Sequence, residues 1–566
     1  MTLRVLAATA GLLMLFGAPV SPASGRQDIL DFYKAPSRGT HPAAAAPLGP
    51  FVPPVSDWRW YEGEPGCVLS PIAQQVDRVV RATMAKNPGM SRASSDRRLT
   101  TRRNAFGPTL MDAKAIFEAA GRLIEVADAE VDLMSFAMEP DAEPYLALVR
   151  AFERRILSGR PFAQPFRLRI YADQLSPLFK GAVARPTAQA LLEPWLAVFR
   201  THRLDPRAIP IEVYVHAHGP MLYHHGARYA VHDKLVIVDG RYVHIGGANP
   251  QAKNNFDHPE RDTAVVMKGE IAGAALEAFD GLWSQTDFSC GILEAGGEYR
   301  PSCTDRRTPF VVEHDATVAS PDFDAIGLSE RACLPMTILS KGKQGYSNLE
   351  GYSNPWAKGL LAAVAASQRH VAMTSPNMNT PPLQAALVEA VTERDVRVNL
   401  LLPFARNEDQ VNFFGGLGSN AHTVNVIRAC GVRARSRSAA QFQQFRSRVQ
   451  VAWWVAEGQT TRFSGDGPGC YHIKFASFDD RALMVGSGNL DDQSFYHSTE
   501  TSILVDSEIV TRAVTAFVFL PEWNRAERVD LWARWAHERP EDRTFLLEVL
   551  EPGAFGLCSG LSYSLK

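Results

Sequence analysis

The sequence predicts an α/β protein built from two similar halves, each contributing part of one catalytic site. A His-x-Lys-x4-Asp motif occurs twice, at 232–239 and at 472–479. A glycine-rich turn with an asparagine follows each copy, and an acidic residue then precedes a short apolar strand. Strands alternate with helices around both copies, which favours an α/β fold in each half. Two motifs with the same downstream order indicate a duplicated half-site, because a motif gains weight from its context.

The predicted elements follow a common order in the two halves. Segments with one apolar face are expected to be helices, and short apolar runs are expected to be strands. In the first half we expect helices over 113–126, 145–157 and 270–283, and strands over 131–138, 166–171, 211–216, 242–245 and 263–267, besides the motif strand. In the second half we expect helices over 357–367, 383–392 and from 508, and strands over 370–374, 396–402, 449–455, 482–485 and 501–505, again besides the motif strand.

The motif histidines and lysines are expected to face one another. Residues i and i+2 of a strand share a face, so His232 should lie beside Lys234, and His472 beside Lys474. Imidazole and ammonium groups suit a phosphate: a neutral histidine can attack phosphorus, and a protonated one can give a proton to the leaving oxygen. The fixed cations stabilise charge, so this chemistry requires no metal and no other cofactor.

Side-chain amides and carboxylates complete the predicted site. Asn249 and Asn489, from the glycine-rich turns, can donate hydrogen bonds to a phosphate. A histidine nucleophile needs its second ring nitrogen held by an acceptor. Asp262 and Glu500, which precede the apolar strands, are the candidates for that role.

This set of residues resembles the signature of the phospholipase D superfamily, over roughly residues 113–523. The resemblance implies two α/β domains that pack about a pseudo-twofold axis and share one active site. It also implies that His232 is the nucleophile, that His472 is the general acid and base, and that the motif acids Asp239 and Asp479 are scaffold residues at strand ends. One departure is Gly247, where the family usually has serine; the second copy keeps Ser487. The missing hydroxyl predicts a weaker first half-site.

The resemblance implies a phosphodiesterase that hydrolyses glycerophospholipid head groups, or transfers them to an alcohol, through a covalent phosphohistidine. Another reaction of the superfamily is an alternative, either a nuclease or a cardiolipin synthase-like phosphatidyl transfer. The two motifs in one chain argue against a nuclease, and the lack of membrane spans ahead of them argues against a cardiolipin synthase. A catalytically idle phosphate-binding protein is the alternative from another class, and the Gly247 departure is what supports it.

Composition and the chain's first residues predict an exported protein. Arg4 precedes an apolar stretch over 5–20, and Ser21-Pro-Ala23 offers small residues for cleavage, as in a signal peptide. The net charge of −2 argues against a nucleic acid partner. We expect a phospholipid at a membrane surface as the substrate and water or an alcohol as the acceptor. We also expect a monomer, because one chain carries both motifs.

The domain plan that follows has six parts. They are a signal peptide (1–23), an N-terminal extension or linker (24–107), a first phospholipase D-like domain (108–290), a connecting region (291–335), a second such domain (336–523) and a C-terminal tail (524–566). Seven cysteines in an exported chain should partly pair, and Cys290 with Cys303 is the first candidate pair.

Two further features have more than one interpretation. The histidines His216, His218, His224 and His225 precede the first motif. They suit the rim of the phosphate site, with metal binding as the alternative. Trp453 and Trp454 are adjacent, so on a strand one ring should face outward, where it could contact a lipid–water boundary.

Overall fold

The computed structural model describes residues 52–64, 66–86, 99–162, 165–174, 184–217, 230–257, 259–283, 289–304, 326–341, 354–404, 420–458, 470–529 and 531. The predicted signal peptide and most of the C-terminal tail lie outside these residues. Within the described parts, no helix combines the length and the apolar character that crossing a membrane requires.

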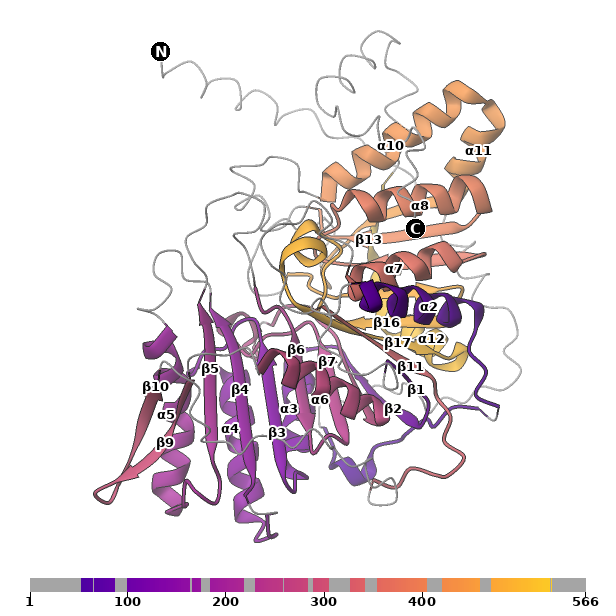
Figure 1. The fold of residues 1–566 in the computed structure, drawn as a ribbon. Coiled ribbons are helices and arrows are strands. Elements are labelled where there is room, and N and C mark those ends of the chain that lie inside the picture. Colours follow the sequence, from indigo (N-terminus) through magenta and orange to yellow (C-terminus); the bar gives the residue numbers. More distant parts are fainter. Residues whose placement is uncertain are drawn as a thin grey trace, which may run out of the picture. The chain divides into compact units, whose positions relative to one another are not determined.

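The first half is built on a nine-stranded sheet in the order β10-β9-β5-β4-β3-β6-β7-β8-β2 (Figure 1). Its strands are β2 (Asn104–Leu110), β3 (Glu130–Ser135), β4 (Arg167–Gln174), β5 (Ile211–Ala217), β6 (Lys234–Val238), β7 (Tyr242–Gly246), β8 (Ala264–Gly269), β9 (Ser289–Ala295) and β10 (Glu298–Thr304). Its helices are α3 (Ala113–Glu125), α4 (Glu143–Leu157), α5 (Ala184–His202) and α6 (Glu270–Trp283).

Side-chain alternation along β3 shows how helices cover both faces of this sheet. Leu133 packs into the large apolar cluster formed with α3, α4 and α5. Asp132, the preceding residue, instead binds Arg169 (2.6 Å), whose guanidinium also binds Asp280 of α6. Successive residues of a strand point to opposite faces, so α3–α5 cover one face and α6 covers the other.

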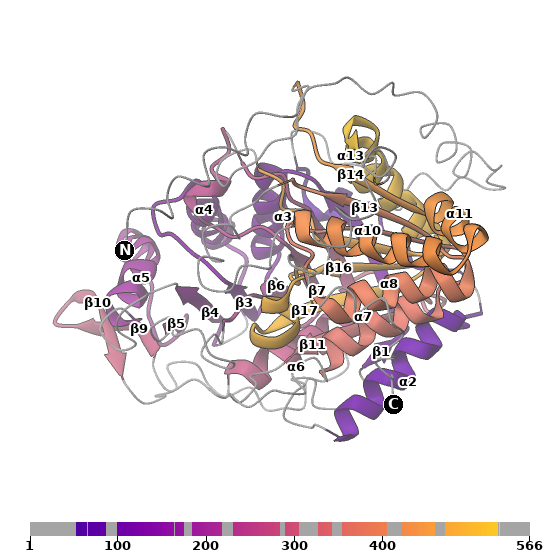
Figure 2. The ribbon, with the colours of Figure 1, turned by 90° about the horizontal axis from the view of Figure 1, so that it is seen from above.

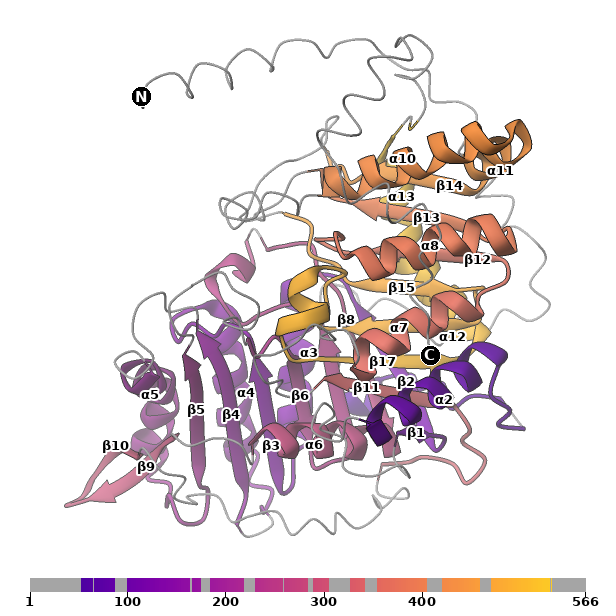
Figure 3. The same ribbon diagram turned by 45° about the horizontal axis from the view of Figure 1, so that its top comes forward.

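The second half is built on another nine-stranded sheet, in the order β1-β11-β17-β16-β15-β12-β13-β14-β18. Its strands are β1 (Thr100–Thr101), β11 (Met336–Lys341), β12 (His370–Thr374), β13 (Arg397–Leu402), β14 (Val449–Trp453), β15 (Phe475–Phe478), β16 (Ala482–Gly486), β17 (Glu500–Asp506) and β18 (Glu527–Arg528). Its helices are α2 (Pro71–Lys86), α7 (Pro355–Ala366), α8 (Pro381–Arg394), α10 (Asn420–Arg437), α11 (Ala439–Arg448), α12 (Glu508–Val514) and α13 (Leu520–Arg525). Helices α2, α7, α8 and α10 lie side by side in Figures 2 and 3.

Seven strands occur in the same order in both sheets, which confirms the predicted α/β fold. The run β5-β4-β3-β6-β7-β8-β2 corresponds to the run β14-β13-β12-β15-β16-β17-β11. In each run the first two pairings are parallel and the other four are antiparallel. The pseudo-twofold axis that relates such halves remains a prediction.

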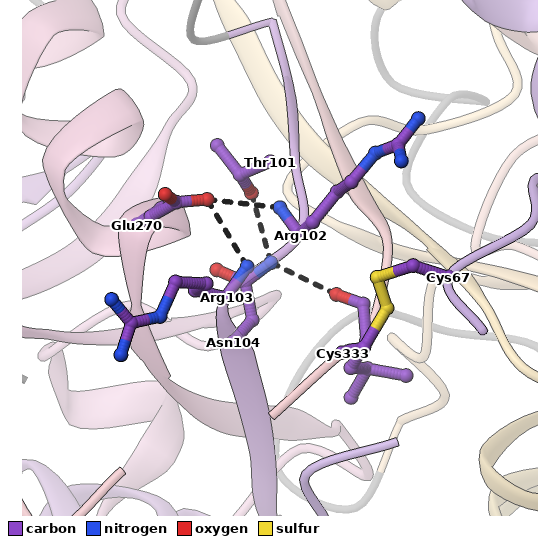
Figure 4. The surroundings of a disulfide bond; sticks show 8 residues. Cys67, Thr101, Arg102, Arg103, Asn104, Glu270 and Cys333 are labelled. Carbon is purple, nitrogen blue, oxygen red and sulfur yellow. Dashed lines mark hydrogen bonds between the residues drawn. A yellow bond between two sulfur atoms is a disulfide. The ribbon is translucent and has the colours of Figure 1, made fainter. Parts of the chain in front are cut away.

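The segment before the first sheet belongs to the second half. Helix α2 packs against α7, and β1 pairs with β11 at the edge of the second sheet. A disulfide between Cys67 and Cys333 links the two segments. Figure 4 shows that, beside this disulfide, the chain crosses from β1 to β2, where the amides of Arg102 and Arg103 donate to Glu270 of α6.

The predicted disulfide between Cys290 and Cys303 is confirmed, and it joins paired positions of β9 and β10. These strands form a hairpin at the edge of the first sheet, although the sequence places most of the hairpin in the connecting region. Cys430 is also disulfide-bonded. Cys470 is a buried thiol whose Sγ donates to Glu260 (3.2 Å).

Several elements were not predicted from the sequence, and one prediction about surface aromatics is wrong. The unpredicted elements include α2, α5, α10, α11, β1, β2, β9, β10, β11 and β18. Trp453 and Trp454 are both buried, with 4% and 2% of their surfaces exposed. Trp453 packs edge-on against Phe404, and Trp454 Nε1 donates to Glu522 (2.7 Å). Neither ring is therefore available to a lipid–water boundary.

Candidate active site

Each motif histidine is held by backbone pairing with the other half. His232 N donates to the carbonyl of Thr499 (3.2 Å), and His472 N donates to the carbonyl of Arg261 (2.8 Å). In both places the histidine segment of one half lies beside the segment of the other half that carries the predicted carboxylate. The two motifs are thereby brought into one site between the halves.

The histidines precede their strands, contrary to the prediction. Strand β6 begins at Lys234 and β15 begins at Phe475, so the alternation of a strand does not set the direction of either histidine. The bridges to the other half replace the regular ladder at these positions. The lysines nevertheless reach back: Lys234 Nζ donates to the carbonyl of His232 (2.6 Å), and Lys474 Nζ donates to that of His472 (2.8 Å).

Each motif histidine contacts a carboxylate that comes from the other half. Glu500 Oε1 lies 2.9 Å from Nδ1 of His232, and Asp262 Oδ2 lies 2.6 Å from Nδ1 of His472. A carboxylate at Nδ1 fixes that nitrogen as the donor and leaves Nε2 for chemistry at a substrate. The structure thus pairs both histidines with the two carboxylates singled out in the sequence, each with the carboxylate from the opposite half.

Glu500 is surrounded by donors. Its Oε1 accepts from Ser494 Oγ (2.6 Å) as well as from His232, and its Oε2 accepts from Ser487 Oγ (2.6 Å). Burial raises the pKa of Glu500, but the interactions with His232 and Lys234 outweigh burial, so the pKa lies below its usual value. Glu500 is therefore ionised at neutral pH.

Asp262 lies in the opposite electrostatic situation. Burial raises its pKa to about 7, against the opposing effects of Lys474 and the Thr263 amide. A second carboxylate, Glu260, adds to the rise, and its Oε2 lies 3.9 Å from His472 Nδ1. The pair formed by Asp262 and His472 therefore retains a proton near neutral pH. When the environments of two such pairs shift their pKa values in opposite directions, one pair can serve as the base and the other as the acid.

Neighbouring side chains hold the motif lysines and the two asparagines. Lys234 lies over the Phe136 ring, with Nζ 5.5 Å from the centroid. Asn249 Oδ1 accepts from Ser135 Oγ (2.9 Å), and Ser135 pairs across the sheet with Lys234. Asn489 Nδ2 donates to Asp491 (3.2 Å). These contacts orient both amides in the segments that follow the motif hairpins.

Asp239 and Asp479 lie at the other end of the motif strands and do not reach the site. Asp239 accepts hydrogen bonds from the amides of residues 128, 129 and 130, and Asp479 accepts from those of residues 368, 369 and 370. Both are scaffold residues, which agrees with the role that the resemblance implies.

Gly247 makes room for Asp262 and does not simply lack a hydroxyl. A Cβ at position 247 would lie 2.7 Å from Oδ2 of Asp262 and closer still to Oδ1. The first half therefore combines glycine with a short carboxylate, whereas the second half combines Ser487 with the longer Glu500. The expectation that Gly247 weakens the first half-site stays a prediction, and the structure adds a steric reason for the glycine, because a serine Cβ would overlap the carboxylate that holds His472.

The sequence reasoning missed three groups at the site: Ser494, Glu260 and Lys341. Glu260 stands two residues before Asp262, a spacing that offered a signal; Ser494 and Lys341 offered none. The histidines at 218, 224 and 225 lie outside the described residues, as does the side chain of His216. In the part of the chain that the structure describes, no group of histidine, cysteine and carboxylate residues is arranged to hold a metal ion.

Anion binding should weaken as the pH rises above 7. Burial and the neighbouring Lys474 lower the pKa of Lys234 to about 7, against the effect of Glu500, so Lys234 loses its charge as the pH rises through that value. We expect the dissociation constant of sulfate, whose charge is constant in this range, to rise by up to about tenfold per pH unit for one linked proton. Titration calorimetry from pH 6 to 9 measures this dissociation constant. Lys234→Arg stays charged, so its dissociation constant should rise less steeply with pH. An equal pH dependence in the two proteins would contradict the assignment of the linked proton to Lys234.

Comparison with known proteins shows which family the chain is similar to. A family model described as "Cardiolipin synthase, PLD-like domain" matches residues 360–518. A phospholipase D of Streptomyces antibioticus is 22% identical over 342 residues, which is 52% of this chain and 59% of that protein. The match thus spans less than two thirds of that relative's length.

Solved structures to which the chain is similar include a phosphatidylserine synthase of Haemophilus influenzae. It is 14% identical, with a TM-score of 0.43, covering 83% of this chain and 97% of that one. NucT from Helicobacter pylori (10% identity, TM-score 0.24) covers 35% of this chain and 99% of its own. Nuc from Salmonella typhimurium, described as a phospholipase D family member, is 15% identical with a TM-score of 0.22. It covers 34% of this chain and 97% of its own.

The fold and the site define an α/β protein in which two half-sites form one histidine–lysine centre. The family model, the curated relative and the two crossed motifs support the assignment of the chain to the phospholipase D superfamily.

Proposed function

We propose that this protein is a phosphodiesterase that hydrolyses glycerophospholipid head groups, or transfers them to an alcohol, with His232 as the nucleophile. The observation that carries the proposal is the crossed pairing of each histidine with a carboxylate, in opposite electrostatic environments. Burial also lowers the pKa of His232, which favours a neutral, nucleophilic imidazole.

In the first step, Nε2 of His232 attacks phosphorus and the bond to the head-group oxygen breaks. Protonated His472 gives its proton to that oxygen, so the head group leaves as an alcohol and not as an alkoxide. In the second step, His472 takes a proton from water or an alcohol, whose oxygen attacks phosphorus and breaks the bond to His232. Lys234 and Lys474 balance the phosphoryl charge throughout, and the two asparagines can donate hydrogen bonds to the phosphoryl oxygens.

A lipid substrate is supported by the named relatives. The matching family model and the curated relative both carry names of lipid-acting proteins.

We further propose that the protein acts outside the cytoplasm, as a monomer, on phospholipid at a membrane surface. The disulfides Cys67–Cys333 and Cys290–Cys303 support this, because disulfides persist in oxidising compartments. Both half-sites lie on one chain, so the site needs no second copy. The net charge of −2 gives no general attraction to nucleic acid.

The test is product release from mixed phospholipid vesicles in the presence of EDTA. Wild type should release free head groups and leave phosphatidic acid, and His232→Ala and His472→Ala should each lose this activity by about 10⁴-fold or more, as when a member of a catalytic unit is removed. Cleavage of single-stranded DNA without lipid turnover would overturn the substrate and keep the chemistry. Inactivity of wild type on every phosphodiester, with retained sulfate binding, would indicate a binding protein.

A further inference from the structure

A lysine outside both motifs is buried beside the carboxylate of the nucleophile. Lys341 is the last residue of β11, has no exposed surface, and pairs across the sheet with Glu500. Its Nζ donates to the carbonyl of Ser494 (2.8 Å). Removing an ammonium group from water is costly unless acceptors and anions surround it. The interactions around Lys341 therefore need an explanation.

Ser494 connects this lysine to His232. The hydroxyl of Ser494 donates to Glu500 Oε1 (2.6 Å) and accepts from the backbone amide of Asn489 (3.0 Å). The same Oε1 binds Nδ1 of His232. Ser494 lies in the single helical turn Gln493–His497, and Lys341 binds the backbone of that turn. Lys341 thus fixes the residue that shares an acceptor oxygen with His232.

The charge of Lys341 acts on the same carboxylate. Three acids from different segments face it: Glu500 of β17, Asp491 after β16 and Asp233 of the first motif. Burial lowers the pKa of Lys341 to about 7, against the effect of these acids. A positive charge next to Glu500 favours its ionised form, which is the form that can hold the His232 proton.

The ladder of the first half places no cation beside Asp262. Strand β2 ends at Leu110, which pairs with Ala264, so the ladder stops before it reaches Asp262, whereas the pairing of β11 with β17 extends to Lys341 and Glu500. Asp112, two residues beyond Leu110, is exposed. Asp112 caps α3 through the amide of Ala115 (2.8 Å). The cation therefore distinguishes the nucleophile's half-site from the acid's half-site.

We propose that Lys341 is a positioning residue that holds the pair of Glu500 and His232 in its nucleophilic form, by anchoring Ser494 and by keeping a positive charge beside Glu500. It acts through these residues and does not touch the substrate. The inference rests on the proposed role of His232 as nucleophile.

The experiment compares Lys341→Gln with wild type in the full chain. Glutamine keeps a donor for the Ser494 carbonyl and removes the charge. Removing a cation makes the pair of Glu500 and His232 bind its proton more readily. We expect the acidic limb of the pH profile of kcat/KM to move to higher pH by about one unit. At a pH below the limb, kcat/KM should then be about tenfold lower than in wild type. Lys341→Arg should retain most of the wild-type profile.

A second readout separates this inference from the proposed function. NMR titration of the His232 Cε1–H resonance, assigned with His232→Ala, reports the proton affinity of the pair without any substrate. A shift in Lys341→Gln together with an inactive wild type would keep the electrostatic coupling and reject the phosphodiesterase. An active wild type with an unshifted resonance and an unshifted limb would reject Lys341 as a positioning residue.

Two further variants provide the controls. Lys268 is also buried and donates to backbone carbonyls, those of Ile326 and Gly327, away from the site. Lys268→Gln should leave the pH profile unchanged, and an equal shift there would overturn the inference. Ser494→Ala removes no buried charge, so it decides the question if Lys341→Gln fails to fold. It should move the limb in the same direction, and an unchanged limb would count against the proposal.

Discussion

Glu500→Gln is expected to lower kcat by about 10⁴-fold, the loss seen when an amide replaces the carboxylate behind a catalytic histidine. Glu500 accepts from His232 Nδ1, Ser487 and Ser494, so three donors point at its two oxygens. Glutamine has one acceptor oxygen, and its amino group would force either a donor–donor contact or the other tautomer of His232. That tautomer carries its proton on Nε2 and cannot attack phosphorus. Steady-state kinetics on vesicles would measure the loss.

Asp506→Asn is the matched control, because Asp506 is a buried carboxylate at the far end of the same strand. It binds the Ser70 amide (2.7 Å) and Arg481 (3.1 Å). Its replacement should lower thermal stability and leave kcat within a few fold. Equal losses in the two variants would mean that the fold of β17, rather than the tautomer of His232, limits the reaction.

Gly247→Ser is expected to lower kcat/KM by about 100-fold, as a displacement of about 1 Å at a reacting group does. The new Cβ would overlap the Asp262 carboxylate, which would then have to move from its position against His472. The reaction should slow at the step that needs the proton of His472. Substrates with better leaving groups should therefore be less affected, and a series of aryl phosphodiesters would show this.

Ser487→Gly gives the comparison for that variant. It removes one donor to Glu500 without creating an overlap, so its loss should be smaller than that of Gly247→Ser. If serine is simply missing from the first half, Gly247→Ser should instead raise the activity. A gain would restore the expectation drawn from the sequence and contradict the steric one.

The sequence contained the site's residue types but not their pairing. Motif spacing identified His232, His472, Asp262 and Glu500, because the order of elements repeats. It did not show that each histidine meets the carboxylate of the other half, since that contact depends on how two distant chain segments pack. Lys341 was missed for a similar reason: it is the last residue of a strand that carries no motif, and only the register with β17 brings it to Glu500.

Secondary structure was predicted well where apolar periodicity was regular and poorly where it was interrupted. Helix α3 and strand β12 match their predicted ranges closely. Helix α5 contains Pro194, which hides its helical pattern, and β2 contains Pro108 beside a register shift in its pairing with β8. The hairpin of β9 and β10 is rich in glycine and charged residues, and the pairing with β5 places it in the sheet.

The position of β1 and α2 in the second half has a consequence for the order of folding. A ribosome makes these segments first, but their partners β11 and α7 follow more than two hundred residues later; the disulfide that joins the two regions spans 266 residues of sequence. The first sheet can form from contiguous chain. The second sheet also includes a segment that was synthesised before the first sheet, and this segment has to wait until its partners have been made. Contacts of such long sequence separation form slowly. The earliest-made part of the described chain is therefore among the last to reach its native place, and the edge of β11 stays uncovered until it does.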